Sequence, residues 1–206
     1  RLDGDVDVDE LAARLSAHGH PPAGAVAVGG PNTPGAPGAE TTAIVDLRAG
    51  EYVMVCVIPG MEDGELHVAK GMVARLTVTP SATTAAMPSP ALVMTLDDYS
   101  FALNAPITPG RHDIRVVNAA VQAHEVVVVR LEPGRTAHDF LAFLQRPEGE
   151  PPGVMIGGTT WLDRGEANVV TLDFEPGEYA LLCFVPDAAD GRLHLAHGMV
   201  RQLRVE

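Results

Sequence analysis

Two stretches of this chain repeat one another, and each contains a cysteine, a histidine and a methionine at the same spacing. The first, Gly50–Val78, reads GEYVMVCVIPGMEDGELHVAKGMVARLTV, and the second, Gly177–Val205, reads GEYALLCFVPDAADGRLHLAHGMVRQLRV. They match at 15 of 29 positions without a gap. The matches include three pairs of potential ligands: Cys56 and Cys183, His67 and His194, and Met72 and Met199. A thiolate, an imidazole and a thioether together suit copper, with methionine as a weak axial ligand, so the pattern predicts a duplicated metal-binding domain.

Three motifs of the second repeat carry a more specific pattern. Asn118-Ala-Ala-Val-Gln-Ala-His124 places a histidine just before a predicted strand, Tyr179-x-x-x-Cys183 ends another strand, and His194-x4-Met199 enters the last. In these motifs the chain resembles the cupredoxins, the blue-copper family of plastocyanin, azurin and halocyanin. The resemblance covers Ala91–Glu206 in full and Arg1–Val78 as the C-terminal portion of such a domain.

The resemblance implies one copper ion held by four side chains of the second domain: His124, Cys183, His194 and Met199. It implies that the two imidazoles and the thiolate form a trigonal plane and that Met199 supplies a long axial bond.

One spacing departs from the family pattern. The family places two to four residues between the cysteine and the second histidine, whereas ten residues separate Cys183 from His194. Both repeats contain an Asp-Gly turn signal in this loop, at Asp63-Gly64 and Asp190-Gly191, which favours a tight hairpin. We therefore expect two protruding hairpins of equal length, with exposed tips at Gly60–Asp63 and Asp187–Asp190, that return each histidine to its cysteine.

The first repeat supplies only part of a ligand set: Cys56, His67 and Met72. Arg1-Leu2 aligns with Arg130-Leu131, and His124 lies six residues before Arg130. The fourth ligand of a first site would therefore lie upstream of Arg1, and we expect the first domain to be incomplete at its N-terminal side. The chain as written can complete one four-ligand site from its own residues, in the second domain.

Other readings of these residues compete with the metal site. A single cysteine at a strand end is usually a small buried hydrophobe, and a single histidine usually lies at the surface. The two cysteines do not predict a disulfide, because they occupy the same place in two different domains. His197 has Lys70 as its repeat counterpart, and a lysine is no copper ligand, so we expect His197 to face solvent. His112 and His138 have no place in the pattern and are expected at the surface.

Composition limits the classes of partner. The net charge of −13 argues against nucleic acid or an anionic membrane as a partner. An acidic surface more often means solubility alone, and the other reading is an electrostatic bias toward a basic redox partner protein. No apolar run approaches the roughly 20 residues that span a bilayer, and no signal peptide is recognisable. An extracytoplasmic location (secreted, periplasmic or cell-surface) is implied by the family resemblance alone. The oligomeric state and the redox partner are not indicated.

The predicted fold is all-β. We expect two tandem Greek-key cupredoxin-like β-sandwiches, each with one short inserted helix, the helices covering Asp5–His18 and Thr136–Gln145. The domain boundaries follow from the repeat and from a Pro/Ser/Thr-rich linker: residues 1–78, a linker at 79–90, and a complete domain at 91–206. The pairs Gly29-Gly30 and Gly157-Gly158 are interpreted as turns.

The leading interpretation is a type 1 copper-binding protein that works as a single-electron carrier and not as an enzyme. Two alternatives stay open: a cupredoxin-scaffold binding or structural module without metal, and a copper sequestration or delivery protein. The seven methionines are scattered rather than clustered, which weakens the delivery alternative. His18-Gly-His20 is similar to the His-x-His pairs of multicopper oxidases, but such enzymes need several pairs and this chain has one.

Overall fold

The computed structural model describes residues 1–33, 35, 38–60, 62–83 and 85–206. These residues fall into two compact units. Unit 1 comprises Arg1–Ala27, Leu47–Ala86 and Ala188–Gly191, and unit 2 comprises Val28–Asp46, Met87–Asp187 and Arg192–Glu206.

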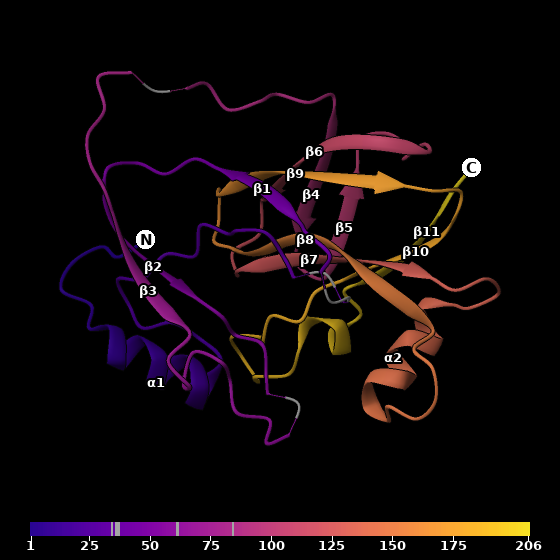
Figure 1. Ribbon diagram of the computed structural model, residues 1–206, viewed down its shortest axis with the longest axis horizontal. Coiled ribbons are helices and arrows are strands. Elements are labelled where there is room, and N and C mark those ends of the chain that lie inside the picture. The colour runs from indigo at the N-terminus through magenta and orange to yellow at the C-terminus, as the bar shows by residue number, and fades with distance from the viewer. Residues whose placement is uncertain (34, 36–37, 61, 84) are drawn as a thin grey trace. The chain divides into compact units, whose positions relative to one another are not determined.

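Unit 2 is a β-sandwich of two sheets (Figure 1). One sheet has the strand order β1-β9-β6-β4-β5 and the other has the order β11-β10-β7-β8. The strands are β1 (Thr42–Val45), β4 (Leu92–Asp97), β5 (Ser100–Leu103), β6 (Gly110–Asn118), β7 (His124–Leu131), β8 (Gly153–Leu162), β9 (Ala167–Phe174), β10 (Gly177–Leu182) and β11 (Val200–Val205).

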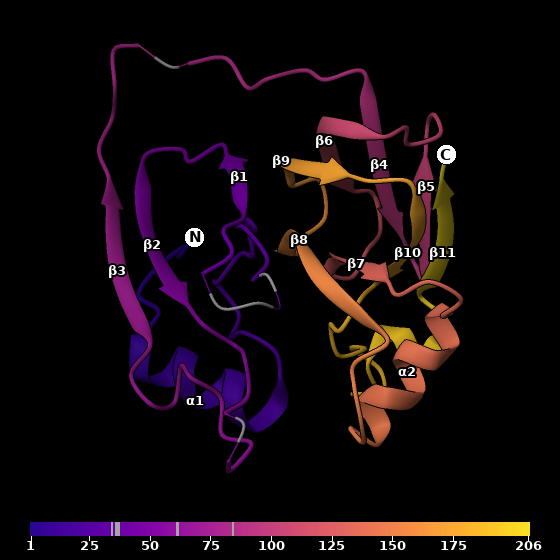
Figure 2. The ribbon, with the colours of Figure 1, turned by 45° about the vertical axis from the view of Figure 1, so that its right-hand side comes forward.

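Strand β7 shows why the sequence favours this arrangement. Its run Glu125-Val-Val-Val-Val129 is buried on both faces, as expected for a central strand covered on both sides. Val126 and Val128 point into the core between the sheets, while Val127 and Val129 pack under helix α2 (Ala137–Gln145). Figure 2 shows α2 beside the sheet that contains β7 and β10. Thr136 and Asp139 form the predicted capping box at the start of this helix.

The structure corrects the interpretation of the two glycine pairs as turns. Gly157 and Gly158 lie inside strand β8, next to a register shift in its pairing with β7. A Cβ atom at Gly158 would come within 1.9 Å of the Val126 carbonyl oxygen, so only glycine allows the strands to approach so closely. Gly29 and Gly30 lie between Val28 and Pro31, which both form bridges to β8. The sequence did not indicate this, because the close approach comes from a partner strand.

Strand β1 belongs to the first repeat in sequence but pairs with β9 of the second. The pairing is antiparallel, and Ala43 lies opposite Val170. These two residues occupy the same position of the repeat, since Gly50 and Gly177 show that its copies are 127 residues apart. A strand of one copy therefore pairs with the equivalent strand of the other. The repeat pattern did not indicate that residues 28–46 belong to unit 2.

Unit 1 contains helix α1 (Val8–His18) and a two-stranded sheet of β2 (Gly50–Val55) and β3 (Val73–Val78). The predicted N-cap of α1 is confirmed, because the Asp7 side chain accepts hydrogen bonds from the backbone N–H groups of Asp9 and Glu10. Gly19 ends the helix in a left-handed conformation with φ of 67°. Leu11 and Leu15 of the helix are buried, as is Tyr52 of β2.

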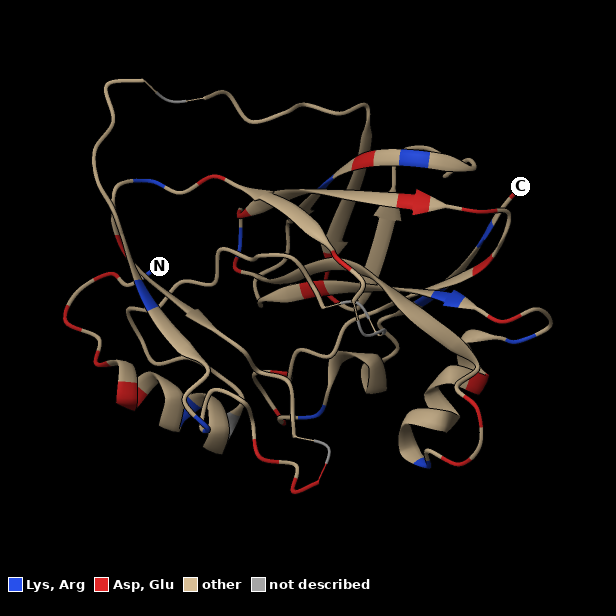
Figure 3. Cartoon of the chain, in the orientation of Figure 1, with Lys and Arg blue, Asp and Glu red and all other residues tan. Residues whose placement is uncertain are grey.

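The predicted fold class is confirmed in its main features: the chain is mostly β-sheet with two short helices. The domain boundaries at residues 78 and 90 stay a prediction. Acidic residues lie on strands, turns and both helices (Figure 3). Among the described residues, no helix is both long and apolar enough to cross a membrane.

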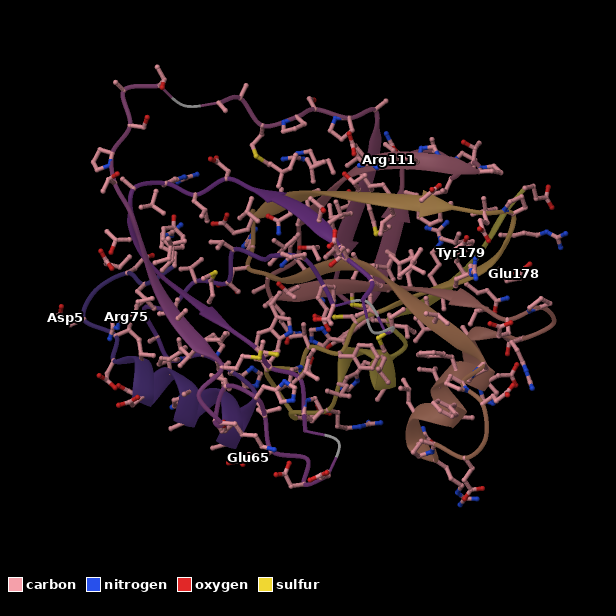
Figure 4. All side chains as sticks on the ribbon, viewed as in Figure 1. Asp5, Glu65, Arg75, Arg111, Glu178 and Tyr179 are labelled. Atoms are coloured by element: carbon pink, nitrogen blue, oxygen red, sulfur yellow. The ribbon has the colours of Figure 1, made fainter. Side chains whose placement is uncertain are left out.

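The side chain of Tyr179 forms hydrogen bonds with the turn between β9 and β10 (Figure 4). It is completely buried, and its hydroxyl donates to the Glu175 carbonyl at 2.9 Å and accepts from the Glu175 N–H at 3.0 Å. Tyr52, its counterpart in the first repeat, donates in the same way to the Arg48 carbonyl at 2.8 Å. Each hydroxyl holds the chain that leads into its cysteine-bearing strand.

We expect Tyr179→Phe to lower the free energy of unfolding by about 1–2 kcal/mol, because it leaves a backbone N–H and carbonyl without their partner. Urea unfolding can be followed by the fluorescence of Trp161, the one tryptophan, which packs against the core of unit 2. Ser100→Ala, which removes an exposed hydroxyl, serves as the control. Equal stability of the two variants would contradict the role assigned to the Tyr179 hydroxyl.

Candidate metal centre

Four elements bring the predicted ligands of unit 2 to one end of the sandwich. His124 is the first residue of β7, and Cys183 directly follows β10, the antiparallel neighbour of β7. His194 begins a short 3₁₀ helix, His194–His197, and Met199 directly precedes β11. All four side chains have 0% exposure. The start of one strand and the end of its antiparallel partner meet at the same edge, which places His124 beside Cys183.

The donor atoms have the separations that a shared metal ion requires. The Cys183 Sγ lies 3.5 Å from the Nδ1 of His194 and 3.9 Å from the Nδ1 of His124. Metal–sulfur and metal–nitrogen bonds of about 2.3 and 2.0 Å, at angles of about 110–130°, give N···S distances of about 3.5–3.9 Å. The three donor atoms lie within 4.8 Å of one another. The observed spacing therefore fits one ion bound by both imidazoles and the sulfur.

A hairpin accommodates the ten residues between Cys183 and His194, as predicted. Pro186 pairs with Leu193 across the hairpin, and the Asp187 N–H donates to the Arg192 carbonyl at 2.8 Å. At its base the His194 N–H donates to the Val185 carbonyl at 2.9 Å. The loop thus folds back on itself, and His194 returns to the level of Cys183.

Groups outside the donor set lie against the two imidazoles and the sulfur. The Nε2 of His124 lies 3.2 Å from Asp98 Oδ1, a contact that leaves Nδ1 as the free lone pair when Nε2 carries the proton. The Glu125 N–H points at the Cys183 sulfur from 3.5 Å. The buried Nε2 of His194 has no hydrogen-bond partner among the described residues, and Asp187 Oδ2 is 3.7 Å from it. Both imidazoles therefore direct Nδ1 at the sulfur and Nε2 at a carboxylate.

Burial sets the protonation of the donors. It raises the pKa of the Cys183 thiol to about 12, with the Glu125 carboxylate as a second cause. It lowers the pKa of His194 to about 4, helped by the nearby His124, and it also lowers the pKa of His124 against the opposing effect of Asp98. At neutral pH the imidazoles are therefore neutral and able to donate lone pairs, while the thiol keeps its proton until a cation displaces it.

Glu125 is a buried acid beside the sulfur that the sequence did not single out. Burial raises the pKa of its carboxyl to about 7, and the Phe184 N–H, which donates to its Oε1 at 3.0 Å, partly offsets this rise. The residue follows a predicted ligand directly within a run of valines, which was the available signal. Its carboxyl group is close enough to the Cys183 thiol to contribute to the raised pKa of that thiol.

Unit 1 reproduces the backbone of the ligand loop. Cys56 Sγ lies 3.6 Å from His67 Nδ1, close to the 3.5 Å of the corresponding pair in unit 2. Three backbone bonds have direct counterparts in the two repeats: His67 N–H to Ile58, Val68 N–H to Cys56 and Met72 N–H to His67. Met72, in contrast, is 58% exposed. No third histidine, cysteine or carboxylate joins Cys56 and His67 in the part of the chain that the structure describes.

Two expectations about residues around the site, the exposure of Asp187 and of His197, were wrong. Asp187 was expected at an exposed hairpin tip, but it is buried at 2% exposure because it bonds inward to Tyr99 and Gln122. His197 was expected to face solvent, but it is half-buried and packs against the ring of Tyr99. Residue 61 of the other tip and the side chain of His18 lie outside the described residues.

The remaining predictions about single residues have plain outcomes. His138 is exposed, as predicted, and His112 is partly buried with its Nε2 2.8 Å from the Thr108 carbonyl. Cys56 and Cys183 are both free thiols. Sequence reasoning missed Asp98 and Tyr99, which form the turn between β4 and β5, because neither residue belongs to the repeat.

Comparisons with known proteins show distant similarity to copper proteins. No family model and no curated protein matches the chain. Among solved structures, auracyanin B is 23% identical, with 59% of this chain and 93% of that chain covered and a TM-score of 0.41. A reduced auracyanin from Roseiflexus castenholzii is 19% identical, with coverages of 55% and 94% and a TM-score of 0.39. A copper-containing nitrite reductase from Thermus scotoductus is 12% identical, with coverages of 77% and 41% and a TM-score of 0.32. Because the similarity is this low, the function of the site has to be derived from its own residues.

The buried His124, Cys183, His194 and Met199 fit a type 1 copper centre. Two neutral imidazoles and a sulfur converge at metal-binding distances, and Met199 is buried in the same core cluster as Cys183. This combination of donors with a weak thioether is the one that type 1 copper sites use. The observed β-sandwich agrees with the all-β fold predicted from the sequence.

The buried Glu125 generates a prediction for the metal-free protein. Its pKa is about 7 in the folded state against an ordinary value of 4.5, so between these pH values the folded protein keeps a proton that the unfolded chain loses. Stability is therefore lost as pH rises through this window. Glu125→Gln keeps an acceptor for the Phe184 N–H and never ionises. Relative to wild type, we expect its free energy of unfolding to be about 2–3 kcal/mol more favourable at pH 8 than at pH 5.

Urea titrations followed by Trp161 fluorescence at both pH values measure this difference. The exposed Glu132→Gln is the control, and its pH profile should match that of wild type. A Glu125→Gln profile parallel to wild type would show that Glu125 is not a buried, neutral acid.

Proposed function

We propose that the protein is a type 1 copper protein that carries single electrons. The observation that supports this most is the convergence of the His124 and His194 Nδ1 atoms on the buried Cys183 sulfur, at 3.9 and 3.5 Å. A bound copper ion would supply a one-electron couple, Cu(II)/Cu(I). The residues of unit 2 would hold it in one geometry in both oxidation states, because the donors sit on sandwich strands and on a hairpin tied by backbone hydrogen bonds.

The closure of the site favours a carrier over an enzyme. Catalytic metal sites keep a position open for water or substrate, whereas all four donors here have 0% exposure. We therefore assign outer-sphere electron transfer, in which the side chains position and insulate the ion and no bond to a substrate forms.

The charge of the chain suggests the partner. With a net charge of −13 and acidic residues on many elements (Figure 3), the protein would attract a basic redox partner at low salt. We further propose, from the resemblance of its motifs to the cupredoxins, that it works outside the cytoplasm. The alternatives of a metal-free scaffold and of copper sequestration or delivery predict different spectra.

The spectrum after addition of Cu(II) tests the proposal. Wild type should take up one copper per chain and turn intensely blue through thiolate-to-copper charge transfer. Cys183→Ser should lose this colour, since serine removes the thiolate with little change in volume. Cys56→Ser is the matched control in the other repeat and should keep the colour. Pale copper binding would support sequestration, absence of binding would support a scaffold, and colour retained in Cys183→Ser would overturn the assignment of Cys183.

A further inference from the structure

The two-residue turn between β4 and β5, Asp98-Tyr99, contacts both histidines of the site. Asp98 lies against the Nε2 of His124 at 3.2 Å. The Tyr99 ring packs edge-on against the His194 ring, with centroids 5.5 Å apart and an interplanar angle of 83°. One short turn therefore forms the outer wall of both imidazoles, although neither of its residues was part of the sequence motif.

A second carboxylate completes the wall at His194. Asp187 Oδ2 lies 3.7 Å from the His194 Nε2, and its side chain is 3% exposed. The Tyr99 hydroxyl donates to this oxygen at 2.5 Å, and the Gln122 amide donates to it at 3.0 Å. Two donors on one oxygen are what an ionised carboxylate accepts. Each imidazole thus has a carboxylate at its Nε2 edge: the half-exposed Asp98 at His124 and the buried Asp187 at His194.

The backbone at Tyr99 is under strain, which points to a role for its side chain. Its φ of 58° is the one positive value among the described non-glycine residues. This left-handed conformation favours Gly or Asn in a tight turn and costs a bulky residue stability. The tyrosine ring is held between His194 and His197, and its hydroxyl is bonded to Asp187. Strain of this kind persists where the surrounding contacts fix the residue.

We propose that Asp98, Tyr99 and Asp187 are positioning residues that set the preference of the copper site for Cu(II) over Cu(I). This inference rests on the proposed function. A negative charge at the Nε2 edge of a ligand imidazole stabilises the higher charge of Cu(II). Asp187 has the larger effect because it is buried and poorly screened, whereas Asp98 is 45% exposed. The Tyr99 hydroxyl moderates Asp187 by taking up part of its hydrogen-bonding capacity.

Reduction potentials of the copper-loaded full chain test the proposal through opposite signs. At a fixed solution potential, Asp187→Asn should shift the Cu(II)/Cu(I) ratio about tenfold toward Cu(I), which is 59 mV for a one-electron couple. Asp98→Asn should shift the ratio in the same direction by about threefold. Tyr99→Phe keeps the ring but frees Asp187 to bond the His194 Nε2, so it should shift the ratio about threefold toward Cu(II). A purely structural role would not give opposite signs for neighbouring, hydrogen-bonded residues.

Glu132→Gln is the control for loss of one negative charge. Glu132 is exposed and directly follows β7, whose other end carries His124, so the two residues are roughly 26 Å apart along the strand. Its potential should equal that of wild type. A shift in Glu132→Gln equal to that in Asp187→Asn, or a shift of Tyr99→Phe toward Cu(I), would overturn the proposal.

A copper-free measurement separates this inference from the proposed function. In ¹⁵N NMR spectra of the metal-free protein, His124 and His194 should both be protonated at Nε2, facing Asp98 and Asp187. An Nδ1-protonated ring would overturn the placement of the carboxylates. If wild type failed to turn blue with Cu(II), the proposed function would fall and the redox role with it, whatever the tautomers. If wild type turned blue and Asp187→Asn left the potential unchanged, the inference alone would fail.

Discussion

Unit 2 depends most on the packing of the Cys183 sulfur against two imidazole nitrogens in the interior. A thiol and two neutral imidazoles replace what would otherwise be apolar core, and each needs a polar contact because no water reaches it. The Glu125 N–H supplies this contact to the Cys183 sulfur and Asp98 supplies it to His124, while Asp187 lies 3.7 Å from the Nε2 of His194. Much of the local structure follows from satisfying this buried polar group while keeping Nδ1 of both rings directed at the sulfur.

The hairpin between cysteine and histidine has the same backbone structure in both repeats, whether or not a complete ligand set surrounds it. Both repeats have the same bridges at their bases and nearly equal Cys–His distances, 3.6 and 3.5 Å. Yet Met72 is 58% exposed in one copy and Met199 is fully buried in the other. The loop sequence therefore determines the approach of histidine to cysteine, and the surrounding sandwich decides whether a closed site results.

Carboxyl groups and backbone strain lie close together at the edge of the site. Asp98 and Asp187 lie at the outer edges of the imidazoles, and the backbone N–H of Glu125 points at the sulfur. Tyr99 adopts a costly backbone conformation and is kept there by its ring contacts and its bond to Asp187. Under the proposed function, the carboxylates of Asp98 and Asp187 would face the bound cation across the two imidazoles.

The sequence by itself determined the residues that are defined by local order along the chain. The repeat gave the Cys–His–Met spacing, the Asp-Gly signals gave the hairpins, and capping residues gave both helices, because each of these depends on neighbours within a few positions. Tertiary structure alone decided three other features: the glycine pair inside β8, the pairing of β1 with β9, and the burial of Asp187 beneath Tyr99. Each of these depends on a partner far away in the chain, whose approach leaves no periodic or compositional signal at the residue itself. A glycine, an edge strand or an aspartate at a hairpin therefore looks the same in sequence whether or not another strand or ring packs against it.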